Sequence, residues 1–148
     1  MILSADSIKF LRPIENMEDE RYVVRGRSAG LSVCSYDLRI DQSLILSPGE
    51  FALGSTIEKF NMPLDVAGYV KDKSSWARQG LGAYNTFVDP GFRGYLTLEL
   101  CNHGHSVLNI QRGDPIVQVV FEWVDKETIG YSGKYSDQEK GPQGVRFE

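Results

Sequence analysis

The sequence has few cysteines, no long apolar segment and no excess of basic residues, and each absence excludes a class of protein. Its two cysteines, Cys34 and Cys101, form no C-x-x-C pair and are too few for a disulfide framework. We expect two small, buried, reduced side chains. No apolar run approaches the roughly 20 residues of a membrane span. The opening MILSADSIKF lacks the basic and apolar regions of a secretory signal, so we expect a cytoplasmic protein.

The charge and the length narrow the class further. The net charge of −4 argues against sequence-independent binding to a nucleic acid polymer, although a few local Lys and Arg side chains can still hold a small anion. The 148 residues suit one domain with a substantial core. Internal repeats are absent, as are the phosphate-binding loop, the G-x-G-x-x-G fingerprint and the G-x-S-x-G elbow.

Most of the chain has the pattern of short β-strands. The segment SADSIKFLRP predicts a short N-terminal helix that Ser4 caps and Pro13 ends. The later segments SYDLRI, SLIL, FALGST, VAGYV, GYLTLEL and PIVQVVFEW are rich in β-branched and aromatic residues, and SPGE, DPGFRG, NHGH and QRGD separate them as turns. This pattern predicts an all-β barrel or sandwich over residues 1–129. Residues 130–148 are glycine-rich with little apolar periodicity, which predicts a mobile tail.

A lone glutamate within the strand YLTLELC is the first candidate for chemistry. The leucines at 96, 98 and 100 share one face, which must be core, whereas Glu99 shares the other face with a threonine and a cysteine. Glu99 is therefore either a solvent-facing carboxylate or a general base in a cleft.

Three further groups have both a structural and a functional interpretation. Asp89 opens a DPGF turn and can also accept a hydrogen bond from a sugar hydroxyl. The segment SSWARQG predicts a helical turn that Ser74 or Ser75 caps and Gly80 ends; with Arg78 one turn later, it is also a candidate anion site. Gln118 is polar within an apolar strand, so it either faces solvent or contacts a phosphate.

The histidines do not predict a metal site. His103 and His105 are two residues apart in one turn, which is too few and too local for zinc. The zinc-deaminase signature, H-x-E with a later P-C-x-x-C, is absent.

Together, in their order along the chain, these segments carry a resemblance. The series SYDLRI, KSSWARQG, DPGFRGYLTLELCN, RGDPIVQVVF and KYSDQEKGP, with the opening MILSADSI, resembles the dCTP deaminase branch of the trimeric dUTPase-like superfamily. The resemblance covers residues 1 to about 142. It implies a distorted jelly-roll-like β barrel, assembled as a homotrimer with sites at subunit interfaces.

The resemblance also implies a substrate and a role for each candidate. The substrate would be dCTP or dUTP, with Mg²⁺ carried by the triphosphate and no zinc. Glu99 would activate the water that attacks C4 of cytosine, helped by Arg78, and Asp89 would lie near the 3′-hydroxyl of the sugar. Other substrate contacts would come from Ser74, Ser75 and Gln118 on the phosphates and from Lys134, Tyr135 and Gln138 in a tail that closes over the nucleotide.

The segment before the Asp89 turn departs from the family. Asn85 and Phe87 stand where the deaminases have alanine and arginine, and the segment looks about two residues shorter. The resemblance implies that this segment reads the base, and an Asn85 amide can donate to and accept from a pyrimidine edge. Three activities therefore remain open: dCTP deamination to dUTP and ammonia, with or without further cleavage to dUMP; a dUTPase-like pyrophosphatase reaction with Asp89 as base; and nucleotide binding without catalysis.

Overall fold

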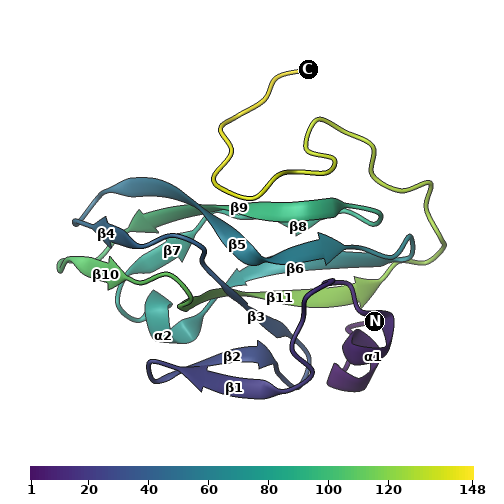
Figure 1. Cartoon of the computed structure of the whole chain (residues 1–148), viewed down its shortest axis with the longest axis horizontal. Helices are drawn as coiled ribbons and strands as arrows, with labels where there is room; N and C mark the ends of the chain where they lie inside the picture. Colours follow the sequence, from purple (N-terminus) through teal and green to yellow (C-terminus); the bar gives the residue numbers. More distant parts are fainter.

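The computed structural model describes all 148 residues and is built almost entirely of β-strands (Figure 1). Its elements are α1 (Ala5–Leu11), β1 (Arg21–Val24), β2 (Arg27–Leu31), β3 (Tyr36–Arg39), β4 (Leu44–Leu46), β5 (Phe51–Asn61), β6 (Val66–Asp72), α2 (Ser74–Ala77), β7 (Leu81–Ala83), β8 (Phe87–Val88), β9 (Arg93–Asn102), β10 (Leu108–Ile110) and β11 (Pro115–Trp123). Each predicted strand segment corresponds to a strand, although FALGST is only the first half of β5. Neither helix has the length and apolar composition needed to cross a membrane.

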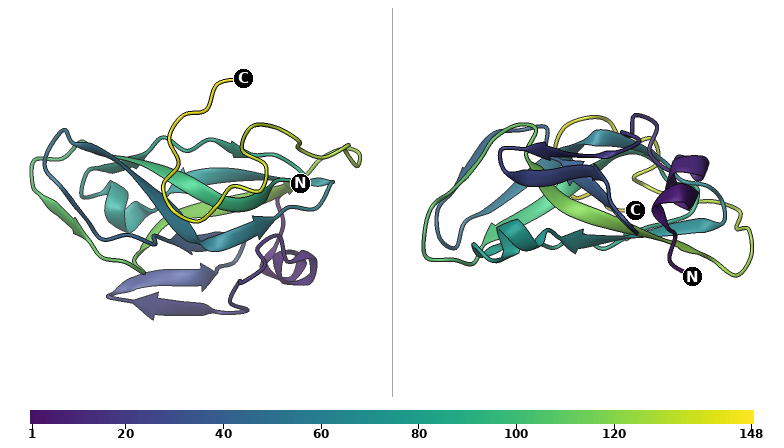
Figure 2. Two further views of the ribbon diagram at one scale, coloured as in Figure 1. Left: turned by 45° about the horizontal axis from the view of Figure 1, so that its top comes forward. Right: turned by 90° about the horizontal axis from the view of Figure 1, so that it is seen from below.

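The strands form three sheets around one apolar core. A six-stranded sheet has the order β1-β2-β3-β11-β6-β8, a three-stranded sheet the order β5-β9-β7, and β10 pairs with β4. Between the larger sheets lie fully buried side chains such as Leu98, Leu100, Val119 and Phe121. The prediction of an all-β, jelly-roll-like fold is confirmed, with the difference that hydrogen bonds do not close the sheets into a barrel (Figures 1 and 2).

The first helix has the predicted N-cap, and the second does not. In α1, the Ser4 hydroxyl accepts from Ser7 N at 3.5 Å, and the helix ends before Pro13, as expected. In α2, the N-cap residue is Lys73 rather than a serine, and no side chain caps the helix. Both serines lie inside its first turn, because the chain turns helical directly after Lys73, whose ammonium pairs with Asp37 at 2.9 Å.

The prediction of two buried cysteines is wrong for Cys34. This residue lies in the short connection between β2 and β3, and its side chain is exposed. Cys101 lies on β9 and is partly buried. Connections between strands run over the surface, so a cysteine within one is solvated whatever its average preference for the interior.

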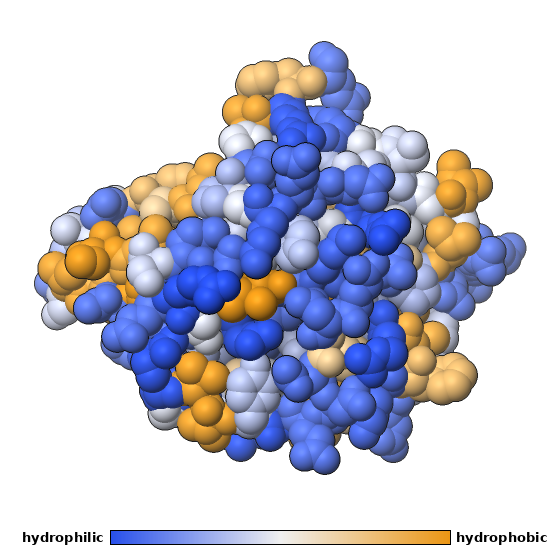
Figure 3. All heavy atoms as spheres, in the orientation of Figure 1, coloured by the Kyte–Doolittle hydropathy of each residue, from blue (hydrophilic) through white to orange (hydrophobic).

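The tail, residues 130–148, turns back over β9, and its last residues then rise away from the sheets (Figures 1 and 2). Gln138 forms a parallel bridge with Gly94 at the start of β9. The rings of Tyr131 and Tyr135 pack against the apolar core. The space-filling view shows the tail standing above the body of the molecule (Figure 3). The tail thus has contacts with the strands and the core, and its mobility stays a prediction.

Candidate active site

A cavity of about 560 Å³ lies between β5, β8, β9 and the tail. Its size is within the range of small-molecule sites. The lining side chains come from the two sheets and from the tail: Phe51, Leu53, Val70, Asn85, Thr86, Phe87, Val88, Asp89, Phe92, Leu96, Thr97, Glu99, Tyr131, Tyr135, Gln138, Gln143, Gly144 and Val145. Most are apolar or aromatic, two are carboxylates, and none is Lys, Arg or His.

Glu99 lies on the wall of this cavity because of the alternation along β9. Its neighbours Leu98 and Leu100 are fully buried in the core, so its own side chain faces the opposite side, as predicted. Burial raises the pKa of Glu99 above its ordinary value, and no cationic side chain lines the cavity to lower it. A carboxylate that water solvates poorly is a stronger base, as proton abstraction requires.

Asp89 lines the same cavity from the turn that follows β8. Its carbonyl accepts from Phe92 N at 3.1 Å, which closes the turn, and Tyr131 N of the tail donates to Pro90 O at 2.8 Å. Gly91 has φ +78, and a Cβ there would lie 2.7 Å from Gly130 Cα, so only glycine lets the tail approach this turn. The structure thus brings Asp89 and Glu99 to one cavity, which the tail also lines.

The segment between β7 and β8 crosses from one sheet to the other. Here the amide of Asn85 bonds to the backbone of β9: Oδ1 accepts from Glu99 N at 2.9 Å and Nδ2 donates to Thr97 O at 2.6 Å. Asn85 was expected to read a pyrimidine edge, but in this structure its amide pairs with the strand. Phe87 lies at the cavity wall, half-exposed, with its ring edge-on to Tyr69.

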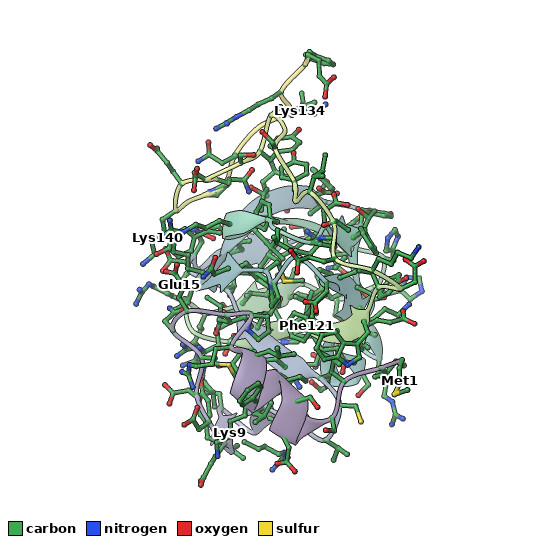
Figure 4. The ribbon with its side chains drawn as sticks, turned by 90° about the vertical axis from the view of Figure 1, so that its right-hand side faces the viewer. Met1, Lys9, Glu15, Phe121, Lys134 and Lys140 are labelled. Carbon is green, nitrogen blue, oxygen red and sulfur yellow. The ribbon has the colours of Figure 1, made fainter.

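The three tail residues predicted to contact the substrate have different environments. Gln138 is buried, and its side-chain N–H donates to Tyr95 O at 2.7 Å and to Thr97 Oγ1 at 3.3 Å. Tyr135 lines the cavity, and its hydroxyl accepts from Arg146 N at 3.2 Å. Lys134 is exposed and does not line the cavity; Figure 4 shows it in the part of the tail that stands away from the sheets.

The other predicted residues lie outside the cavity. Ser74 in α2 and Arg78 directly after α2 are exposed, and the hydroxyl of Ser75 is buried with no partner. Gln118 on β11 is partly buried and donates to Asp72 O at 3.0 Å. Figure 1 shows α2 on the opposite side of the sheets from the tail. Within one chain, the predicted phosphate contacts therefore lie apart from the predicted base and sugar contacts.

The two histidines lie at the surface, outside the cavity. His103 and His105 are exposed, and His103 Nε2 lies 2.8 Å from the hydroxyl of Tyr84. No three side chains of His, Cys, Asp or Glu are grouped closely enough to hold a metal ion. The prediction that the chemistry needs no zinc stays a prediction.

Several lining residues were absent from the predicted site. Phe51 and Leu53 come from the first half of β5, and Tyr131 and Gln143 come from the tail. An aromatic residue within a glycine-rich segment was the available signal for Tyr131. No local pattern indicated Phe51 or Leu53, because only the pairing of β5 with β9 brings them opposite Glu99 and Cys101.

Comparison with known proteins gives a consistent result. A family model described as dCTP deaminase-like matches residues 16–124. A protein of Corynebacterium kroppenstedtii named dCTP deaminase, dUMP-forming, is 50% identical over 112 residues, which cover 73% of this chain and 60% of the relative. A protein of the same name from Methanoculleus marisnigri is 36% identical over 107 residues, which cover 68% and 57%. The chain thus spans less than two thirds of the length of these relatives.

Solved structures support the fold. The EIAV dUTPase superposes with a TM-score of 0.59 at 20% identity, covering 82% of this chain and 92% of that one. The dUTPase from phage phi11 of S. aureus superposes with a TM-score of 0.58 at 16% identity, covering 81% and 92%. At this level of identity, the likeness concerns the arrangement of the strands alone.

Proposed function

The chain belongs to the dCTP deaminase-like family, and on that premise we propose that it deaminates dCTP and carries the product on to dUMP. In the first step, water replaces the 4-amino group of cytosine, which gives dUTP and ammonia. In the second step, water cleaves the phosphate anhydride, which gives dUMP and pyrophosphate. The observation that carries the proposal is Glu99, a carboxylate of raised pKa in a mostly apolar wall that has no basic side chain and that also includes Asp89.

Glu99 would act on the water and on the leaving group in turn. Its carboxylate takes a proton as the water oxygen bonds to C4, and the tetrahedral intermediate holds the new hydroxyl and the amino group on the same carbon. Glu99 then returns the proton to the amino nitrogen, the C4–N bond breaks, and ammonia leaves. General acid–base help of this kind contributes about 10²–10⁴-fold. We assign the contact with the sugar 3′-hydroxyl to Asp89.

The triphosphate needs cations that the cavity does not supply. None of its lining residues is basic, and its two carboxylates repel a polyanion. We therefore propose that Ser74, Ser75, Arg78 and Gln118 of a neighbouring copy bind the triphosphate at the mouth of the cavity, with Arg78 also helping to place the water. Mg²⁺ would enter as part of the substrate, bound to the phosphate oxygens. This arrangement requires an oligomer, and the family resemblance favours a homotrimer.

A second candidate is a dUTPase-like pyrophosphatase with Asp89 as the base. One observation favours it: Asn85 and Phe87 depart from the deaminase pattern before the turn. A purely nucleotide-binding protein is the third possibility, but such a protein has no use for a desolvated carboxylate at Glu99.

Product analysis separates these activities. The purified protein is given dCTP or dUTP with Mg²⁺, and ammonia, pyrophosphate and the nucleotide products are measured separately. The proposal predicts ammonia and dUMP from dCTP. Ammonia with dUTP as the final product restricts the protein to deamination. Pyrophosphate from dUTP, with no ammonia from dCTP, identifies the pyrophosphatase and contradicts the proposal.

A further inference from the structure

The edge of β9 opposite β5 is covered by a series of partners from different parts of the chain. Leu81–Ala83 of β7 pair with Asn102–Leu100, and Tyr84 N then donates to Glu99 O at 2.8 Å. After this bond the backbone leaves β9, because Phe87 and Val88 of β8 pair with β6 in the other sheet. Further along the edge, Gln138 of the tail bonds to Tyr95. The chain thus departs from β9 beside Glu99.

The side chain of Asn85 fills the place that the departing backbone leaves. Its amide oxygen accepts from Glu99 N at 2.9 Å, and its amide nitrogen donates to Thr97 O at 2.6 Å. These two bonds lie on either side of Leu98, where a neighbouring strand would otherwise pair with β9. Together with the bond from Tyr84 N, they hold both backbone polar groups of Glu99 at the point where its side chain enters the cavity.

We propose that Asn85 is a positioning residue, which fixes the backbone of Glu99 so that its carboxylate faces the substrate, and that Asn85 does not itself read the base. The inference rests on the proposed function for the role of Glu99, and on the two hydrogen bonds for the role of Asn85. An amide suits this task because it both donates and accepts without adding charge to the cavity. Alanine, serine and leucine cannot make both bonds.

Because of the groups around Glu99, its pKa responds to changes at Asn85. The titratable groups that line the cavity with it are Asp89 from the turn and the hydroxyls of Tyr131 and Tyr135 from the tail, and no cation faces it. Removing the Asn85 side chain admits water to the carboxylate and lowers its pKa toward the ordinary value. An aspartate at the same position adds a like charge and raises the pKa of Glu99 further. The displacement in Asn85→Asp follows from the added charge alone, so the displacement in Asn85→Ala, read together with the exchange of the Glu99 amide, carries the test.

The test compares Asn85→Ala and Asn85→Asp with the wild type, with Asn109→Ala as a matched control. Asn109 is an exposed asparagine on β10, and its side chain makes no hydrogen bond in the structure. Hydrogen exchange at the Glu99 amide, kcat and KM for dCTP with Mg²⁺, and the pH dependence of kcat are measured for each protein. The titration of the Glu99 carboxyl is followed by NMR.

The proposal predicts a specific pattern. In Asn85→Ala, the Glu99 amide exchanges several-fold to about tenfold faster, as expected for the loss of one net hydrogen bond. The value of kcat falls about 10- to 100-fold, because a displaced base no longer meets its water, whereas KM changes less than about threefold. The titration of Glu99 moves to lower pH in Asn85→Ala and to higher pH in Asn85→Asp. Asn109→Ala behaves as the wild type.

Three results for Asn85→Ala would overturn the positioning role. The first is unchanged protection of the Glu99 amide, and the second is a kcat within twofold of the wild type with an unchanged titration of Glu99. The third is a raised KM with kcat intact, which would make Asn85 a direct reader of the base. If Asn85→Ala does not fold, Asn85→Asp decides, since it keeps an acceptor for Glu99 N. If wild type releases no ammonia from dCTP, the proposed function fails, but amide exchange and the carboxyl titration still decide the role of Asn85.

Discussion

Replacing Gly94 with alanine should detach the tail from β9. Gly94 has φ +132, and a Cβ there would lie 2.6 Å from Gln138 N and 2.7 Å from Gln138 O. Both are backbone atoms, so no side-chain rotation relieves the overlap, and the tail itself must move. The movement breaks the bond from Tyr95 N to Gln138 O at 3.0 Å and the bond from Gln138 Nε2 to Tyr95 O at 2.7 Å.

The magnitude follows from those two bonds. Each contributes a net ~0.5–1.5 kcal/mol, so their loss favours tail opening by about 1–3 kcal/mol, or roughly 5- to 150-fold in the opening equilibrium. The strained backbone adds about 1–3 kcal/mol to the cost of folding in its own right. Gly49→Ala is the control for that strain, because Gly49 has φ +82 but nothing within 4 Å of its Cβ position.

Limited trypsin digestion reports tail opening, because Lys134, Lys140 and Arg146 all lie in the tail. Trypsin should cleave the tail of Gly94→Ala roughly 5- to 150-fold faster than that of the wild type, and the Tyr95 amide of Gly94→Ala should also exchange faster. Gly49→Ala should lose stability without faster cleavage of the tail. Equal cleavage rates in Gly94→Ala and the wild type would refute the reasoning, since the tail would then not depend on its contact with β9.

Three further predictions concern charge, metal and assembly. Burial raises the pKa of Glu99, so the folded state binds the proton of this carboxyl more tightly than the unfolded state does. Stability is therefore lost as the pH rises from the pKa of Glu99 in the unfolded state through its pKa in the folded state. Glu99→Gln should therefore unfold at a higher temperature than the wild type at pH 8, with the advantage diminishing toward pH 4; an equal advantage at both values would contradict this. EDTA should abolish turnover and Mg²⁺ should restore it, whereas stoichiometric zinc in the purified protein would contradict the zinc-free chemistry and implicate His103 and His105. Light scattering should give three times the 16.6 kDa chain mass, and a monomer would contradict a site shared between copies.

Local patterns predicted the parts of the molecule that local physics determines. The alternation of β9 placed Glu99 opposite the leucine face, and the cap and proline of α1 marked its ends. In the same way, Asp-Pro-Gly predicted the turn that carries Asp89. Each of these features depends on residues within one turn or one strand of each other.

Features that depend on distant parts of the chain could not be read from the sequence. The bulge between Ser55 and Lys59 lets β5 continue along β9 well beyond the predicted segment, and no motif marks it. Asn85 and Gln138 looked free to bind a nucleotide, but β9 supplies backbone partners to both amides. Which strand edge is left open depends on how the sheets assemble, and a single sequence does not state that.

The most direct test of the central claim compares wild type and Glu99→Gln with dCTP and Mg²⁺. Glutamine keeps the shape of the side chain and leaves the leucine face of β9 untouched, but it is not a base at neutral pH. The account predicts that Glu99→Gln binds dCTP as the wild type does, measured by calorimetry, and releases ammonia at least about 100-fold more slowly. Release of ammonia by Glu99→Gln at the wild-type rate would contradict it.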